Sequence, residues 1–243
     1  MNIALLGYGA MGKEIERIAL ERGHTITGRF NITAPATPQT IVADVAIDFS
    51  AAGAVVENAT ICAESGVNLV IGTTGWNAQK EEVEKVATKA GIGVVYGSNF
   101  SVGMQLFFRI VGKAAHLVNG TPDYDILMHE LHHKRKADSP SGTALSLADI
   151  ILQHVTRKEH VQPETQHGRI NENALHVSST RGGEIAGTHT VYLDSLADTI
   201  ELTHRAKNRS GFALGAVIAA EWVADKKGFH DFTDIFESIV SAS

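Results

Sequence analysis

The sequence predicts an α/β protein in which a parallel-sheet domain is interrupted by a second domain of the α+β class. Two observations lead to this prediction. The first hundred residues alternate short apolar runs with stretches of helical periodicity, which is the pattern of β-α-β units around a parallel sheet. After Asn99 the order of segments changes, and an Ala-rich apolar helix later returns. We therefore predict that residues 1–103 and 212–243 form the first domain and residues 104–211 the second.

In the first domain, strand-like and helix-like segments follow one another at short intervals. Apolar or β-rich runs predict strands at 3–6, 25–30, 45–49, 68–72 and 92–96. Helical spacing predicts helices at 10–22, 52–65 and 77–90. Gly23 ends the first of these helices, and two prolines favour a loop over 33–40.

The second domain begins with a predicted helix at 102–117, followed by an apolar, strand-like run at 123–131. A helix at 142–155 comes next, and the polar stretch 156–172 is predicted to be a loop. Three closely spaced runs, at 174–181, 187–194 and 199–205, predict strands that are antiparallel neighbours. The chain then returns to the first domain with predicted helices at 212–223 and 231–240.

Composition excludes several classes of function. The formal net charge of -6 lacks the basic excess with which proteins neutralise nucleic-acid phosphates, so nucleic acid is not an expected partner. Cys62 is the only cysteine, which rules out an intramolecular disulfide and fits a reducing compartment. The N-terminus has no basic start, and no run reaches the roughly 18 apolar residues of a membrane span. We expect a cytoplasmic protein with no membrane partner.

A glycine-rich turn follows the first predicted strand and opens the first predicted helix. It consists of Gly7, Tyr8, Gly9, Ala10, Met11 and Gly12. In a Rossmann-type dinucleotide-binding domain the first glycine permits the turn, the second admits the pyrophosphate, and the third lets the helix pack on the strand. The sequence therefore predicts NADH or NADPH as cofactor. Asn31 stands where a carboxylate usually holds the ribose, so we expect both cofactors to be used.

Residues 129–133 match the HExxH pattern, in which two histidines on one helical turn bind zinc beside a glutamate base. The preceding residues favour a strand, and Pro140 follows soon after, so His129 and His133 have no common helix. The neighbouring cations Lys134, Arg135 and Lys136 also disfavour a divalent metal. We therefore predict no metal site and set the metallopeptidase interpretation aside.

Residues 130–143 can instead be interpreted as the end of a strand, a loop and the start of a helix, and this arrangement suits the binding of an anion and the transfer of protons. Two imidazoles and a basic cluster precede a new helix N-terminus, where Ser141, Gly142 and Thr143 can present N–H groups and a hydroxyl to an anion such as a carboxylate. Histidine exchanges a proton near neutral pH, and lysine can supply both charge and a proton. An exposed basic loop before a capped helix is the simpler alternative.

The pattern of residues 130–144 resembles the signature of the dihydrodipicolinate reductase family, also called the 4-hydroxy-tetrahydrodipicolinate reductases of lysine and diaminopimelate biosynthesis. The matching positions are Glu130, His132, His133, Lys136, Asp138, Pro140, Ser141, Gly142, Thr143 and Ala144. The resemblance extends over nearly the whole chain, through the glycine turn and the segments 48–50, 72–75, 98–103, 181–184, 187–190 and 212–217. The departures are a short segment after the second strand and Asn31.

This resemblance implies hydride transfer from NADH or NADPH to a small cyclic dicarboxylate, 4-hydroxy-tetrahydrodipicolinate, with loss of water. It implies that His132 is the proton donor or acceptor, Lys136 a proton donor, and His133, Gly142 and Thr143 substrate ligands. Residues around the cofactor would be those of the glycine turn and Gly72, Thr73, Thr74, Gly97, Ser98, Asn99 and Phe100. The family also implies a homotetramer joined through the sheet of the second domain.

A protein of another class remains an alternative. A non-catalytic dinucleotide sensor could keep the turn at residues 7–12 while its second domain binds a partner. That alternative gives no account of His132, His133 and Lys136 in front of a helix N-terminus, and turnover of the cofactor would separate the two hypotheses.

Overall fold

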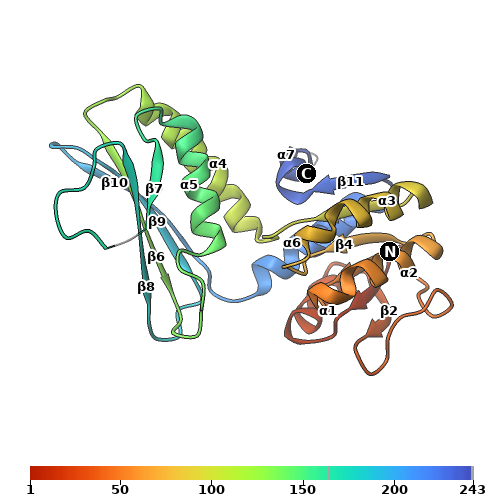
Figure 1. Ribbon diagram of the computed structural model, residues 1–243. Helices are drawn as coiled ribbons and strands as arrows, with labels where there is room; N and C mark the ends of the chain where they lie inside the picture. Colours follow the sequence, from red (N-terminus) through yellow and green to blue (C-terminus); the bar gives the residue numbers. More distant parts are fainter. Residues whose placement is uncertain (164, 242–243) are drawn as a thin grey trace. The chain divides into compact units, whose positions relative to one another are not determined.

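The computed structural model describes residues 1–163 and 165–241, which form two compact units. The first unit contains Met1–Val102 and Arg209–Ser243, and the second contains Gly103–Asn208. The second unit is thus an insertion into the first, and its ends differ by one and three residues from the predicted bounds of 104 and 211. Each unit is built around its own sheet (Figure 1).

The first unit has a six-stranded parallel sheet in the order β11-β5-β4-β3-β1-β2. Its strands are β1 (Asn2–Leu6), β2 (Thr25–Phe30), β3 (Val45–Asp48), β4 (Asn68–Ile71), β5 (Gly93–Tyr96) and β11 (Gly228–Asp231). Its helices are α1 (Ala10–Glu21), α2 (Val55–Glu64), α3 (Lys80–Ala90), α6 (Ser210–Val223) and α7 (Phe232–Ser241), with the short 3₁₀ turns η1 (Ala52–Ala54) and η2 (Asn77–Gln79).

Helices cover both faces of this sheet because its buried strands are apolar on both sides. Ile3 and Leu5 point to the face where α1, α6 and α7 pack, whereas Ala4 and Leu6 point to the face covered by α2 and α3. Cys62 is fully buried on the second face, and burial raises the pKa of its thiol far above the usual range. The three-layer arrangement confirms the predicted α/β class.

The second unit has a five-stranded mixed sheet in the order β10-β9-β6-β8-β7. Its strands are β6 (Asp125–His132), β7 (His160–Gln162), β8 (Ala174–Arg181), β9 (Thr188–Asp194) and β10 (Thr199–Arg205). Helices α4 (Val102–Asn119) and α5 (Gly142–His154) cover one face of this sheet (Figure 1). Met128, Val177 and Val191 pack against these helices in one apolar core.

Three expectations for the strands need correction. β8 and β9 are not neighbours, because β6 lies between them, parallel to β8 and antiparallel to β9. The stretch 156–172 is not entirely a loop, since β7 lies within it and pairs with β8. The strand β11 was not predicted at all. All three depend on partners distant in sequence, which local periodicity does not specify.

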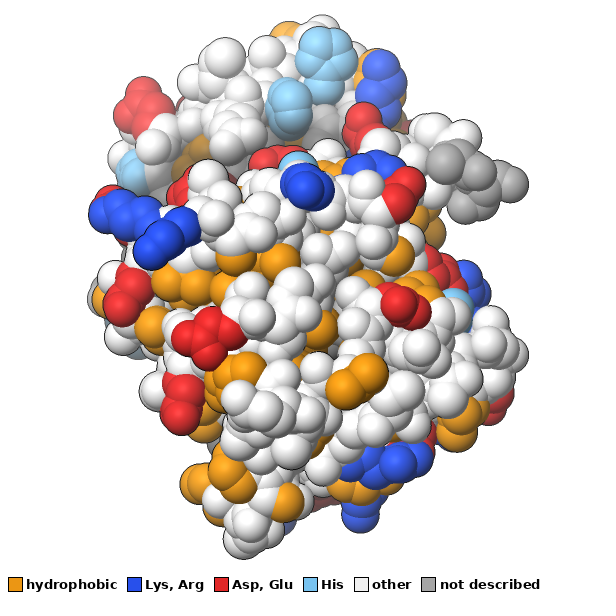
Figure 2. Space-filling model, turned by 90° about the vertical axis from the view of Figure 1, so that its right-hand side faces the viewer, with side chains coloured by type: hydrophobic (Ala, Val, Ile, Leu, Met, Phe, Trp, Pro, Cys, Tyr) orange, Lys and Arg blue, Asp and Glu red, His pale blue; other side chains and the backbone are white. Residues whose placement is uncertain are grey.

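The surface carries mixed side chains. On the face shown in Figure 2, Lys and Arg lie in separate small groups among acidic, hydrophobic and neutral side chains. Among the described residues, no helix is long and apolar enough to cross a lipid bilayer.

Candidate active site

The three glycines of the turn have three different environments. Gly7 has φ +94°, and a Cβ there would lie 2.3 Å from the carbonyl oxygen of Phe49. A Cβ on Gly12 would lie 2.4 Å from the Gly7 oxygen, so this glycine lets α1 pack tightly against the turn. Nothing lies within 4 Å of a Cβ on Gly9. Gly9 therefore leaves the open space that a pyrophosphate at the start of α1 needs.

A cavity of about 700 Å³ adjoins this turn at the carboxyl ends of β1, β2 and β3. Its lining includes Gly7, Tyr8, Gly9 and Asn31 from the predicted cofactor residues, together with Phe49 and Ser50. Parallel α/β sheets bind ligands at this edge, where the order of strands reverses around β1. Ala10, Met11 and Gly12 form the first turn of α1 beside it.

The side-chain oxygen of Asn31 already accepts hydrogen bonds from neighbouring residues. Oδ1 accepts hydrogen bonds from the backbone N–H groups of Thr33 and Ala34, at 2.9 and 3.0 Å, and from the Thr33 hydroxyl at 2.8 Å. Arg29, two residues earlier, pairs with Glu16 on α1, which also accepts a hydrogen bond from Tyr8. The charge of Arg29 is therefore neutralised by Glu16 within the protein.

Other predicted cofactor residues lie at the same sheet edge but have structural partners. Thr73 is buried and donates to Asp48 Oδ1 at 2.8 Å, next to the end of β3. Phe100 is buried and stacks on Phe232, with ring centroids 4.5 Å apart. Asn99 Oδ1 accepts from the Ser101 N–H. The remaining predicted residues of this edge are Gly72, Thr74, Gly97 and Ser98, of which Thr74 and Ser98 are exposed.

In the second unit, β6 presents two chemically active side chains on its buried face. Alternation places Ile126, Met128, Glu130 and His132 on the side of α4 and α5. Ile126 and Met128 belong to the apolar core of the second unit. Glu130 and His132 lie on the same face of the strand, next to this core. His132 is thus the buried last residue of a strand that extends one residue beyond its predicted end at 131.

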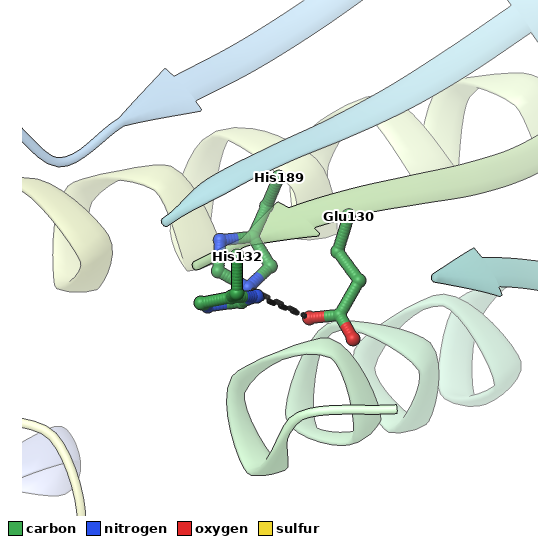
Figure 3. A group of neighbouring side chains, drawn as sticks. All are labelled: Glu130, His132 and His189. Carbon is green, nitrogen blue, oxygen red and sulfur yellow. Dashed lines mark ion pairs between the residues drawn. The ribbon is translucent and has the colours of Figure 1, made fainter. Parts of the chain in front are cut away.

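Sheet register brings polar side chains from two other strands to Glu130. His189 on β9 and Ser179 on β8 are directly opposite Glu130, and Arg181 on β8 is opposite His132. Glu130 Oε1 accepts from the Ser179 hydroxyl and from Arg181 Nη2, both at 2.8 Å. Figure 3 shows the imidazoles of His132 and His189 on the other side of this carboxylate, 3.2 and 3.5 Å from Oε2.

These surroundings shift two pKa values. Burial opposes ionisation of Glu130, but the nearby His189 imidazole and hydrogen bonds from Ser141, Arg181 and Ser179 outweigh it and hold the pKa of the carboxyl well below its usual range. Burial lowers the pKa of His132 to about 4, although the Glu130 charge opposes this change, and the groups of His189, Lys136 and Arg181 add to the lowering. His132 is therefore neutral at pH 7 and Glu130 is charged.

The loop from β6 to α5 carries the other predicted substrate residues. Ser141 caps α5, because its hydroxyl accepts from the Ala144 N–H at 3.1 Å, while its own N–H donates to Glu130 Oε1 at 2.8 Å. Gly142 and Thr143 form the first turn of the helix that begins there. His133 follows His132 directly, and Lys136 Nζ lies 2.8 Å from Asp138 Oδ1. The second unit thus gathers all five predicted catalytic and substrate residues around the end of β6.

The HExxH pattern lies on a strand, as predicted, so His129 and His133 share no helical turn. His129 Nδ1 instead lies 2.7 Å from the Ser178 hydroxyl. A different set, Glu130, His132 and His189, brings three potential metal ligands within 4.8 Å of one another. The guanidinium of Arg181 already neutralises this carboxylate, and a cation so close disfavours a divalent metal.

Glu130, Arg181 and His189 were not among the functional residues predicted from the sequence. The signal that was available is the alternation within residues 126–132, which places a carboxylate and an imidazole on the same face as Ile126 and Met128. A buried charge on a strand requires partners, but the identity of those partners depends on the neighbouring strands.

Comparison with known proteins adds a decisive observation. Residues 1–100 match the family described as dihydrodipicolinate reductase, N-terminus, and residues 103–236 match the one described as dihydrodipicolinate reductase, C-terminus. The chain belongs to the dihydrodipicolinate reductase family. The predicted resemblance is confirmed, and family membership makes the protein an oxidoreductase and sets the sensor alternative aside.

Two curated proteins of the dihydrodipicolinate reductase family, both named 4-hydroxy-tetrahydrodipicolinate reductase, illustrate the similarity. The one from Christiangramia forsetii is 39% identical and the match covers 98% of this chain and 99% of the relative. The one from Methanosarcina acetivorans is also 39% identical, with 96% and 88% covered. In fold, the chain is similar to the dipicolinate-bound dihydrodipicolinate reductase from Paenisporosarcina sp. TG-14, with a TM-score of 0.76, 23% identity and 97% and 99% of the chains covered.

Proposed function

We propose that the protein reduces 4-hydroxy-tetrahydrodipicolinate to tetrahydrodipicolinate, with one NADH or NADPH oxidised, one proton consumed and one water released. The observation that carries this proposal is the convergence of a buried neutral imidazole, a lysine and a helix N-terminus at the end of β6. A cyclic dicarboxylate needs anion-binding groups beside groups that move protons, and this segment supplies both.

The first unit is the proposed site of the pyridine nucleotide. The open space at Gly9 and the cavity beside Asn31 fit a pyrophosphate and an adenosine ribose, respectively. When bound, the nicotinamide supplies the hydride. We infer that the protein uses both NADH and NADPH, because Asn31 provides no carboxylate to repel a 2′-phosphate and Arg29 is held by Glu16.

In the second unit, Gly142 and Thr143 are the proposed ligands of a substrate carboxylate, since backbone N–H groups and the helix dipole at the start of α5 favour an anion. His133 and Lys136 add hydrogen-bond donors and charge in the same loop. Lys136 is the proposed proton donor. His132, neutral in the free protein, is positioned to take or give a proton at its ring.

We further propose a homotetramer joined through the second sheet, in a cytoplasmic protein with neither membrane nor nucleic-acid partners. Leu127 and Tyr192 are directly opposite each other on β6 and β9, and alternation directs them away from the face that α4 and α5 cover. Leu131 lies on the same side. These three apolar side chains, among polar ones on a face turned away from the core, are suited to contact a second copy.

The experiment that tests the activity uses the purified full chain and the condensation product of pyruvate and aspartate semialdehyde. Consumption of NADH or NADPH that depends on this product is the expected result. Clean binding of the cofactor without turnover would contradict the proposal and favour a sensor. Sedimentation equilibrium of the same preparation tests the tetramer, which a monomer or dimer at micromolar concentration would contradict.

A further inference from the structure

The two carboxylate oxygens of Glu130 have partners of different kinds. Oε1 accepts three hydrogen bonds, from the Ser141 N–H, the Ser179 hydroxyl and Arg181 Nη2, each 2.8 Å long. These donors come from the loop before α5 and from β8, so this oxygen is fixed from two directions. Three donors also fill its capacity to accept hydrogen bonds.

The other oxygen, Oε2, faces the catalytic imidazole. It lies 3.2 Å from His132 Nδ1, and within the described residues neither atom makes a hydrogen bond of good geometry, with the other or with any other group. His189 Nε2 lies on the same side at 3.5 Å. Both Oε2 and Nδ1 are inaccessible to solvent, and a buried polar atom without a partner is costly. A hydrogen bond between Nδ1 and Oε2 would satisfy both atoms, and their separation of 3.2 Å brings it within reach of a small rotation of the ring.

We propose that Glu130 is a positioning residue that fixes the tautomer of His132, with the ring proton on Nδ1 and the lone pair on Nε2. Glu130 does not touch the substrate in this assignment. It acts through the imidazole, as a carboxylate does when it orients a catalytic histidine. The proposal rests on the proposed role of His132 in proton transfer.

The surroundings of the opposite nitrogen agree with this assignment. Nε2 faces Gly187, where a Cβ would lie 3.1 Å from the ring nitrogen. Gly187 has φ +153°, and any residue with a side chain at this position would crowd His132 Nε2. Nδ1 thus faces the Glu130 carboxylate. Nε2 faces Gly187, which has no side chain to block it.

A metal ion between the same atoms is the competing interpretation. Glu130 Oε2, His132 Nδ1 and His189 Nε2 are close enough to act as three ligands. Arg181 Nη2, however, is bound to the same carboxylate at 2.8 Å and supplies the charge that a metal would otherwise supply. A proton on Nδ1 satisfies the oxygen without adding a second cation beside the guanidinium.

The tautomer of the unmodified protein provides the first test. His132 is neutral at pH 7, so ¹⁵N-labelled histidine should give NMR signals of a single neutral ring form. We expect a protonated Nδ1 and an unprotonated Nε2, with the signal assigned by its loss in His132→Gln. A proton on Nε2, or perturbation of the ring nitrogens by added Zn²⁺ at stoichiometric concentration, would overturn the proposal. This readout does not depend on activity.

Glu130→Gln provides the second test, because its effect on the tautomer follows from the contacts. The amide oxygen must replace Oε1 to accept the three donors, which places the amide NH₂ opposite His132 Nδ1. A donor there requires Nδ1 to become the acceptor, and the ring proton moves to Nε2. We expect kcat to fall by roughly 10²- to 10⁴-fold, the scale seen when a catalytic histidine is held in the wrong tautomer. Because the amide oxygen keeps the bond to Ser141, KM should change by less than about threefold.

Glu221→Gln is the matched control. Glu221 also binds one arginine and one histidine, with Arg22 Nε at 2.7 Å and His24 Nε2 at 2.8 Å, but it belongs to the first unit. It should lower thermal stability without changing kcat or the His132 signals. If Glu130→Gln keeps the wild-type tautomer and loses less than about fivefold in kcat, Glu130 has only a structural role. Normal turnover by His132→Gln would instead contradict the proposed function and leave the tautomer result standing.

Discussion

Lys136 Nζ and Asp138 Oδ1 lie 2.8 Å apart in the loop between β6 and α5. Lys136 is the main cause that holds the pKa of Asp138 below its usual range, and the backbone N–H of Gly142 adds to the effect. In the free protein, a carboxylate of the chain therefore interacts with two groups that we assign to the substrate. A substrate carboxylate has to compete with Asp138 for them.

Asp138→Asn should therefore lower KM for the dicarboxylate. Asp138 is 55% exposed, and exposed ion pairs contribute about 0.2–1 kcal/mol, so we expect a decrease of up to about fivefold with kcat nearly unchanged. Steady-state kinetics at fixed ionic strength provides the measurement. Glu184→Gln, which removes the exposed partner of Arg135, is the control and should leave KM as it is. A higher KM in Asp138→Asn would mean that Asp138 holds Lys136 in its productive position.

His132→Gln and Lys136→Ala should each lower kcat by roughly 10²- to 10⁴-fold, because each removes a positioned proton-transfer group. The dissociation constant of NADH should stay unchanged, since both residues belong to the second unit and the glycine turn to the first. Kinetics with the authentic substrate and fluorescence titration with NADH are the measurements. Near-normal kcat in either variant would remove that residue from the mechanism.

The lowered pKa of His132 predicts how stability depends on pH. The unfolded chain binds a proton at this residue below its ordinary pKa of 6.5, whereas the folded protein does so only below about 4. The unfolded state therefore binds more protons in this window, and stability is lost as the pH falls through it. Between pH 7 and pH 5 the contribution is about 2 kcal/mol. Urea unfolding at both pH values should show that His132→Gln loses correspondingly less stability than the wild type; the exposed His160→Gln serves as control.

The cofactor preference should be small, below about tenfold in kcat/KM, or roughly 1.4 kcal/mol. Asn31→Asp should shift this ratio toward NADH, because the new charge repels the 2′-phosphate of NADPH. An aspartate keeps an oxygen for the three bonds that Oδ1 of Asn31 accepts, so the loop should retain its conformation. Discrimination by several hundredfold in the wild type, or an unchanged ratio in Asn31→Asp, would show that this residue does not contact the ribose.

Metal chelators should leave turnover intact, and elemental analysis of the purified protein should find no stoichiometric zinc. The physical reason is that His129 and His133 share no helical face and that Arg181 neutralises the nearby carboxylate. One tightly bound zinc per chain, with activity lost on its removal, would contradict this prediction.

Elements that local interactions specify could be predicted from the sequence, whereas contacts between distant segments could not. The bounds of β2, β8 and β10 were predicted without error, because apolar runs and turn residues specify them locally. β7 has only three residues and exists through its pairing with β8, so no local pattern marks it. The glycine turn was interpretable because backbone geometry demands glycine at Gly7 and Gly12. The partners of Glu130 could not be predicted, since they come from β8, β9 and the loop before α5, and the sequence does not display the order of the strands.

The buried Cys62 thiol leaves the folded native chain unreactive toward thiol reagents. It is the only cysteine, it lies on the buried side of α2, and burial keeps its thiol protonated. Maleimide dyes should leave the folded protein unlabelled. A cysteine introduced at an exposed position, such as Leu196→Cys at the turn between β9 and β10, would then be the single attachment point for a fluorophore or spin label. Pairs of such positions, one in each unit, would allow distances to be followed as cofactor and substrate bind, without replacement of the native cysteine.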